Sequence, residues 1–211
     1  MKSIETNTIG DAWVESIKTV LDLGKTVHDG DTKLKEFINL AIKINHPEKE
    51  DDILKKYADE KMIEFMISNF LEKEPVLNWG YSYGQRIYDF SGINQFKKIA
   101  NKLKKNPESK SATISLMNPP EDQKHVPCIT VLDFKIRDGH LLATAFFRSQ
   151  DIGKKFYADA ICIGKIGKMI SEKINNVPVK LLFVISSAHI YEPDIEKVKK
   201  IVGDQDGLVK S

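Results

Sequence analysis

A cysteine and an arginine separated by 20 residues form the most reactive combination in this sequence. Cys128 lies near the start of an apolar, β-branched stretch over residues 126–135, and Arg148 ends a similar stretch over residues 140–148. The intervening Asp138-Gly139 pair has the composition of a two-residue turn, so the two stretches predict a β-hairpin. Counting along this hairpin, we expect Cys128 to lie directly opposite Arg148.

Such a pairing would favour the thiolate form of the cysteine. Directly opposed side chains in an antiparallel pair lie about 5 Å apart on one face of the sheet. A fixed guanidinium at that distance favours ionisation of a thiol, and the thiolate is the nucleophilic form. The alternative is a small core cysteine beside a surface arginine at a strand end, because buried cysteines are usually inert.

The motifs around this pair resemble, in type and order, the thymidylate synthase family, which includes the deoxycytidylate hydroxymethylases. The blocks are Tyr81–Arg86 (Y-S-Y-G-Q-R), Asn106–Lys110 (N-P-E-S-K), Pro127-Cys128, Arg148–Asp151 (R-S-Q-D) and Ser186–Tyr191 (S-S-A-H-I-Y). They cover about residues 60–195. The first 60 residues match less specifically, in the manner of the short archaeal-type members.

The resemblance implies an α/β (α+β) fold, with a large bent mixed sheet covered by helices. We expect one domain over residues 1–211, with a polar tail over about residues 203–211. The implied activity is transfer of a one-carbon unit to carbon 5 of a pyrimidine nucleoside monophosphate, through a Cys128 adduct at carbon 6. Methylenetetrahydrofolate would be the co-substrate. The family also implies a homodimer that requires neither a metal nor a nucleic acid.

The R-S-Q-D block carries most of the implied substrate contacts. Arg148 would present its bidentate donor fork to the nucleotide phosphate, and Ser149 would add a second phosphate contact. Gln150 belongs to the same binding segment. Asp151 would help to order both the nucleotide and the folate.

Other implied ligand contacts lie farther along the chain. His189 and Tyr191 alternate on one strand, so both point to the same side, where the family holds the ribose hydroxyl. Lys110 replaces the first of two arginines that reach the phosphate in the partner subunit, and the second arginine is missing. The family's N-terminal phosphate-binding arginine is also absent, and either Lys25 or Lys33 could substitute for it.

Proton transfer and folate binding have their own candidates. Glu64 resembles the helix glutamate that steers proton movement through water, with Glu60 as an alternative. Tyr83 matches the tyrosine that relays a proton near carbon 5 of the base. Trp79 could stack on a folate ring or pack at the rim, and Tyr81 is expected to be a packing residue.

Asp159 bears on the choice of base. It lies where thymidylate synthases carry an asparagine that reads uracil, and cytosine reverses the hydrogen-bonding pattern that this asparagine matches. A carboxylate accepts from the amino group of cytosine, as in the related cytidylate hydroxymethylases. The sequence therefore favours hydroxymethylation of dCMP or CMP. A thymidylate synthase acting on dUMP and a non-catalytic nucleotide- or RNA-binding relative remain alternatives.

Composition is typical of a soluble globular protein. The chain has 32 Lys and Arg residues against 30 Asp and Glu residues, which gives no general case for nucleic-acid binding. Two cysteines do not make a disulfide framework, and the first residues lack the apolar core of a signal peptide. No apolar run is long enough to span a bilayer, so we expect a cytoplasmic protein.

Hydrophobic periodicity and turn residues predict the remaining elements. Helices are expected over residues 8–23, 55–72, 92–105, 155–174 and 194–202, and strands over residues 112–117 and 180–186. Residues 24–33 should form a polar loop, and residues 34–44 could be either a strand or a short helix.

Overall fold

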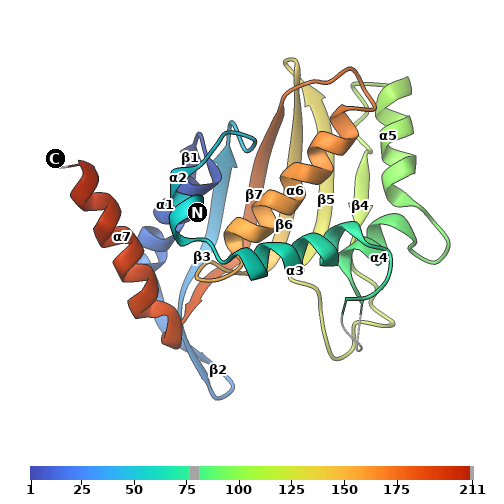
Figure 1. Ribbon diagram of the computed structural model, residues 1–211. Coiled ribbons are helices and arrows are strands. Elements are labelled where there is room, and N and C mark those ends of the chain that lie inside the picture. The colour runs from blue at the N-terminus through green and yellow to red at the C-terminus, as the bar shows by residue number, and fades with distance from the viewer. Residues whose placement is uncertain (77–80, 210–211) are drawn as a thin grey trace.

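Long strands of mixed direction form the centre of the molecule, as shown by a computed structural model that describes residues 1–76 and 81–209 (Figure 1). The strands are β1 (Lys2–Thr6), β2 (Lys25–Asp29), β3 (Thr32–Ile44), β4 (Thr113–Ser115), β5 (Ile129–Arg137), β6 (His140–Asp151) and β7 (Val179–Tyr191). Their order in the sheet is β1-β3-β7-β6-β5-β4, and β2 pairs with the N-terminal part of β3. The β1–β3 and β6–β7 pairs are parallel and the others antiparallel, so the expected large mixed sheet is confirmed.

Helices cover the face of this sheet that is turned toward the viewer in Figure 1. They are α1 (Ile9–Leu23), α2 (Asp52–Tyr57), α3 (Glu60–Leu71), α4 (Tyr83–Tyr88), α5 (Gln95–Lys105), α6 (Phe156–Ser171) and α7 (Ile195–Val209). A short 3-10 turn at Glu192–Asp194 precedes α7. Helices α1 and α6 pack directly on the strands, and α3 packs on α6. The expected α/β class is therefore confirmed.

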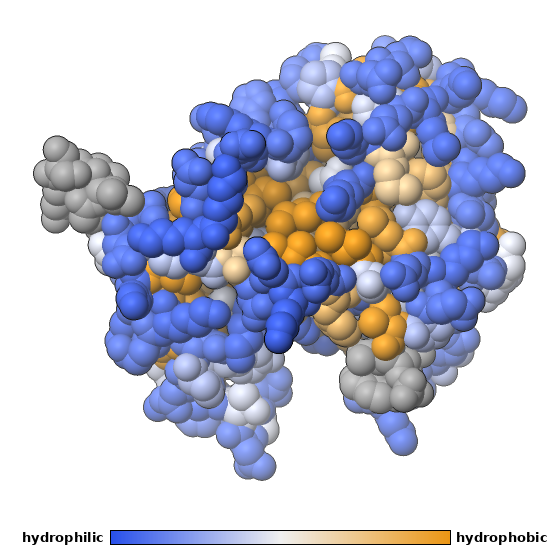
Figure 2. All heavy atoms as spheres, viewed as in Figure 1, coloured by the Kyte–Doolittle hydropathy of each residue, from blue (hydrophilic) through white to orange (hydrophobic). Residues whose placement is uncertain are grey.

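Helix α1 illustrates how the sequence specifies these contacts. Thr8 caps the helix by accepting a hydrogen bond from the backbone N–H of Asp11, which satisfies one of the donors that the first turn leaves unpaired. Trp13 and Ile17 are buried by their helical spacing, and the indole N–H of Trp13 donates to the carbonyl of Ile152 at 2.7 Å. Figure 2 shows further apolar side chains gathered over α3 and α6, and hydrophilic side chains surround them.

Two sequence-based expectations are wrong in the first half of the chain. Residues 24–33 do not form a loop: they contain β2 and the turn that joins it to β3, and residues 34–44 are strand. The helix expected over residues 55–72 is two helices. The chain breaks at Asp59, because its backbone N–H donates to the Tyr157 hydroxyl and its carboxylate caps the start of α3.

Most of the other element boundaries differ by a few residues. Helix α5 begins at Gln95 because the Asn94 side chain caps it, and β7 continues well past residue 186 to Tyr191. The C-terminal helix continues through Val209, so most of the tail expected over residues 203–211 is helical. Extension of β7 matters most, since its last residues reach the functional site.

The β5–β6 hairpin has the expected turn, with Arg137 paired to His140. An unbroken ladder from that turn would place Cys128 opposite Ser149. A β-bulge between Ile129 and Val131 shifts the register by one residue, and the backbone N–H of Arg148 donates to the carbonyl of Cys128 at 2.9 Å. The expected pairing of Cys128 with Arg148 is therefore present, although the count along an unbroken hairpin was wrong by one residue and the bulge supplies the difference.

Candidate active site

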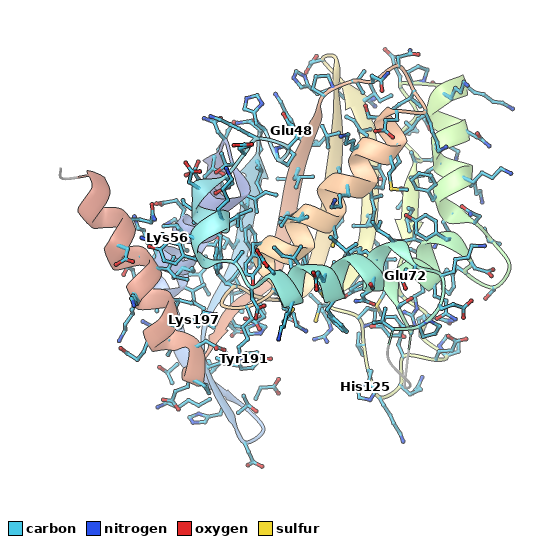
Figure 3. All side chains as sticks on the ribbon, viewed as in Figure 1. Glu48, Lys56, Glu72, His125, Tyr191 and Lys197 are labelled. Atoms are coloured by element: carbon cyan, nitrogen blue, oxygen red, sulfur yellow. The ribbon has the colours of Figure 1, made fainter. Side chains whose placement is uncertain are left out.

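A cleft of about 920 Å³ opens at the end of the sheet where β6 and β7 finish. Its walls come from the β2–β3 hairpin, the ends of β6 and β7, helices α3 and α6, and the segment that precedes Cys128. Tyr191 and His125, which both line the cleft, lie at this same lower end of the molecule in Figure 3. The volume lies in the range of pockets that bind small molecules and cofactors.

Cys128 is half-buried in the wall of the cleft. Its Sγ atom lies 3.6 Å from the Ser149 Oγ atom and 4.0 Å from the Arg148 Nη2 atom. Both neighbours are hydrogen-bond donors, so a thiolate would be met by a hydroxyl and a guanidinium on the adjacent strand. This arrangement is suited to an exposed nucleophile and differs from the environment of Cys162, which is buried in α6.

The Arg148 guanidinium is held by the segment that leads into the nucleophile. Its Nε donates to the carbonyl of Pro127 at 3.1 Å, and its Nη2 donates to the carbonyl of Val126 at 2.7 Å. Its Nη1 donates to the Ser149 hydroxyl at 3.3 Å. These contacts fix the side chain in the cleft, and they leave few of its five N–H groups for a ligand.

Asp159 and Gln150 form a buried pair in the cleft wall. Asp159 lies in the first turns of α6, and its Oδ2 accepts from Gln150 Nε2 at 2.8 Å, while its Oδ1 has no partner in the described structure. Burial raises the pKa of Asp159 to about 7, although the bond from Gln150 opposes this rise. The carboxyl is therefore close to half-ionised at neutral pH.

Two tyrosines lie next to the nucleophile. The Tyr83 hydroxyl accepts from the backbone N–H of Ile129 at 3.3 Å, one residue from Cys128, and burial raises its pKa well above the usual value. The Tyr81 ring lines the cleft and stacks 3.5 Å from the Arg86 guanidinium, and burial raises its pKa to about 12. Both phenols stay protonated at neutral pH and can donate. Tyr81, which the sequence assigned to packing, is thus part of the cleft.

The far side of the cleft is built from the ends of β6 and β7. Asp151 pairs with His189 across the two strands, and the His189 ring packs edge-on against Tyr191 with centroids 4.9 Å apart. Burial raises the pKa of Asp151 and lowers the pKa of His189. The Nε2 atom of His189 is buried, with no hydrogen-bond partner in the part of the chain that the structure describes.

Some candidates from the sequence lie outside the cleft. Glu64 and Glu60 are exposed on α3, whose side chains in the cleft are instead Phe65, Met66 and Asn69. The proton-steering role expected for Glu64 is therefore not supported by its position. The helical period explains the error, because residues one and two positions away from Glu64 occupy the inward face.

The cations also differ from those expected. Lys33 is exposed and pairs with Glu192, and neither Lys33 nor Lys25 lines the cleft. Lys110 is exposed in the connection from α5 to β4, also outside the cleft of its own chain. The cleft is instead lined by Lys124 and Lys155, together with three histidines, namely His28, His125 and His189. Lys124 and His125 lie shortly before the Pro127-Cys128 motif, which was the available sequence signal.

Trp79, the candidate for folate stacking, lies outside the described residues. Within residues 1–76 and 81–209, no cluster of three or more His, Cys, Asp or Glu side chains could hold a metal ion. None of the helices in this described part combines the length and apolar character needed to cross a membrane.

Comparisons with known proteins agree with the motifs in the cleft. A family model described as thymidylate synthase matches residues 22–206. A protein of Methanosarcina mazei named "Putative thymidylate synthase" is 31% identical over 203 residues, which cover 94% of each chain. A protein of Methanothermobacter thermautotrophicus with the same name is 30% identical over 217 residues, covering 95% of this chain and 98% of its own. One from Methanocaldococcus jannaschii, again of that name, is 29% identical over 214 residues, covering 95% of this chain and 96% of its own.

Proposed function

The chain belongs to the thymidylate synthase family and is a pyrimidine nucleotide C5-transferase, and we propose that it hydroxymethylates dCMP or CMP with methylenetetrahydrofolate as co-substrate. The choice of cytosine over uracil rests on a single observation, which is the environment of Asp159. A buried carboxyl lies in the cleft with one oxygen unpartnered, at the position where the resemblance implies an asparagine in enzymes that read uracil. That oxygen can accept a hydrogen bond from the amino group on carbon 4 of cytosine.

The reaction begins with the Cys128 thiolate adding to carbon 6 of the base, so that the electron pair of the 5,6 double bond becomes available at carbon 5. Carbon 5 attacks the one-carbon unit, and the proton on carbon 5 leaves. Elimination of the folate amine gives an exocyclic methylene group. Water adds to that group, the 5,6 double bond re-forms, and the thiolate leaves.

The neighbours of the nucleophile support these steps. Ser149 and Arg148 donate toward the sulfur, which stabilises the thiolate before addition and after its release. The Tyr83 hydroxyl, held at the backbone of Ile129, would relay the proton from carbon 5. Because both tyrosine pKa values in this region are raised, Tyr81 and Tyr83 act as donors unless a base removes their protons.

Nucleotide and folate would occupy different parts of the cleft. His189 and Tyr191 would hold the ribose hydroxyl, and Arg148 and Ser149 the phosphate, with Lys124 adding positive charge in the absence of the arginines. Asp151 lies between the two groups on β6 and would order the nucleotide and the folate. The Tyr81 ring, fixed by its stack on Arg86, offers an apolar face to the folate.

A homodimer would complete the phosphate site through Lys110 of the second copy. Phe146 on β6 is 40% exposed between buried neighbours, so it points away from the helices that cover the other face of the sheet. A hollow of about 260 Å³ beside it is lined by Val184 and Ile185, among others. A second copy packed on this face would bury Phe146 and the exposed part of Val184. Sedimentation that shows only monomer at micromolar concentration would contradict the dimer.

The decisive experiment measures release of tritium from carbon 5 of dCMP, CMP and dUMP in the presence of methylenetetrahydrofolate. This step precedes the entry of water, so it reports base choice alone. We expect release from a cytidylate, formation of the 5-hydroxymethyl nucleotide by mass, and no dihydrofolate absorbance. Release from dUMP alone, accompanied by dihydrofolate, would refute the proposal.

One observation favours a second candidate, methylation of dUMP. A carboxyl with a pKa near 7 is partly protonated at neutral pH, and its O–H could donate to the carbonyl on carbon 4 of uracil. The names of the relatives point the same way. The assay above separates the two candidates, because only a hydride transfer oxidises the folate to dihydrofolate.

A further inference from the structure

Gln150 and Asp159 join strand β6 to helix α6 within the cleft wall. Gln150 is 2% exposed and Asp159 is 4% exposed, and both line the cleft. Among the described residues, the one side-chain hydrogen bond made by either of them runs from Gln150 Nε2 to Asp159 Oδ2 at 2.8 Å. Since a side-chain amide can donate only through its nitrogen, this bond fixes both the amide orientation and the rotation of the carboxyl.

We infer that Gln150 is a positioning residue that keeps Asp159 in the oriented, hydrogen-accepting form required to read the amino group of a cytosine. This inference rests on the proposed function and gives Gln150 a role that the motif alone did not define. By occupying Oδ2, the amide leaves Oδ1 as the oxygen available to a base. By donating to the carboxyl, it also favours the ionised state over the protonated state.

The other groups around Asp159 cannot replace this donor. Lys155 lowers the pKa of Asp159 only through its charge, and Asp151 raises it. Asp159 also interacts electrostatically with the Tyr83 hydroxyl and the Cys162 thiol, but burial raises the pKa of each, so both remain neutral. Within the described residues, Gln150 is thus the one side chain that donates a hydrogen bond to this carboxyl.

Loss of the donor has a specific consequence for substrate choice. Burial would then hold Asp159 protonated at neutral pH. The acid keeps a carbonyl acceptor, but without the amide its O–H is free to take the position that faces the base. A donor opposes the amino group on carbon 4 of cytosine and suits the carbonyl of uracil. Removing Gln150 should therefore weaken cytosine binding in a way that a higher pH reverses.

The test uses Gln150→Met, which keeps the length of the side chain and removes the donor, in the full-length protein carrying Cys128→Ser to prevent turnover. Binding of dCMP and dUMP is measured by titration calorimetry between pH 6 and pH 9. We expect the pH midpoint for dCMP binding to rise by about one to two units, the size expected for losing a hydrogen bond to a charged group. At pH 7 the affinity for dCMP should fall about tenfold, while the affinity for dUMP should not fall.

Two further variants separate positioning from folding. Gln150→Glu fits the same space and places a second carboxyl beside Asp159, so it should raise the midpoint in the same direction. Ser171→Ala removes a partly buried hydrogen bond to the Val177 carbonyl at the other end of α6, about 18 Å along the helix, and should leave the midpoint unchanged.

The outcomes distinguish the inference from the function on which it rests. Suppose that the Cys128→Ser parent prefers dCMP. The positioning role is then wrong if the Gln150 variants show the same pH midpoint for dCMP binding as the parent, or if their affinities for dCMP and dUMP fall by the same factor at every pH. If the parent itself binds neither nucleotide, or prefers dUMP, the proposed function fails and the inference fails with it.

Discussion

Asp159→Asn should stabilise the folded protein, and this effect should grow with pH. The carboxyl has a pKa of about 7 in the folded chain, against 3.8 for the unperturbed group. Between these values the folded chain binds more protons than the unfolded chain. The free energy of unfolding therefore falls as pH rises through this window, and Asp159 destabilises the protein most above pH 7.

The magnitude follows from the size of the pKa shift. A shift of about three units corresponds to about 4 kcal/mol of lost stability above pH 7, of which about 3 kcal/mol develops between pH 5 and pH 8. An asparagine of the same shape does not titrate, so the variant escapes this loss. For a chain of this length, about 3 kcal/mol corresponds to a change in Tm of roughly 6–12 °C.

Thermal unfolding of wild type and Asp159→Asn at pH 5 and pH 8 measures the effect directly. Burial also raises the pKa of Asp151 and lowers that of His189, but both groups are present in each protein, so most of their contribution is common to the two. Asp138→Asn, in the exposed hairpin turn, controls for the loss of one charge. A Tm difference between wild type and Asp159→Asn that is equal at the two pH values would refute the reasoning.

Further expectations concern the nucleophile, the base and the scaffold. Cys128→Ser should abolish tritium release from carbon 5 while nucleotide still binds, and iodoacetamide should modify Cys128 faster than Cys162, whose pKa is raised by burial. Asp159→Asn should move the dCMP-to-dUMP ratio of kcat/KM toward uracil by about ten- to a hundredfold, and an unchanged ratio would remove Asp159 as the base reader. Asp122→Asn should lower the free energy of unfolding, measured in urea, by about 3–5 kcal/mol. The reason is that it leaves the Arg86 guanidinium, which is 2% exposed, without its charged partner, and a loss under about 1 kcal/mol would contradict this.

The parts of the fold that the sequence predicted are those set by local chemistry. The turn at Asp138-Gly139 and the apolar stretches beside it specify the β5–β6 hairpin, and the spacing of Trp13 and Ile17 specifies α1. The errors occur where distant residues decide. The break at Asp59 depends on the Tyr157 hydroxyl, 98 positions away, and no local pattern reveals that bond. Residues 24–33 read as a loop because their strand is exposed and therefore polar.

The candidate site also contains residues that local motifs predicted and residues that only the tertiary packing could reveal. Cys128, Arg148 and Asp159 lie in motifs with fixed spacing, so their type and order sufficed to place them together. Glu64 was misplaced because helix orientation depends on packing, and α3 turns other side chains into the cleft. The pairing of Gln150 with Asp159 joins two elements in three dimensions, so it became visible only in the structure.

Two buried atoms connect the stability of this cleft to its ligand. Asp159 Oδ1 and His189 Nε2 both lack a hydrogen-bond partner among the described residues, although native proteins pair nearly all buried polar atoms. A nucleotide bound as proposed supplies both partners at once, with its amino group at Asp159 and its ribose hydroxyl at His189. The free protein then carries unpaired groups that only the correct ligand satisfies, which is also the physical basis of selectivity against a base with the opposite pattern.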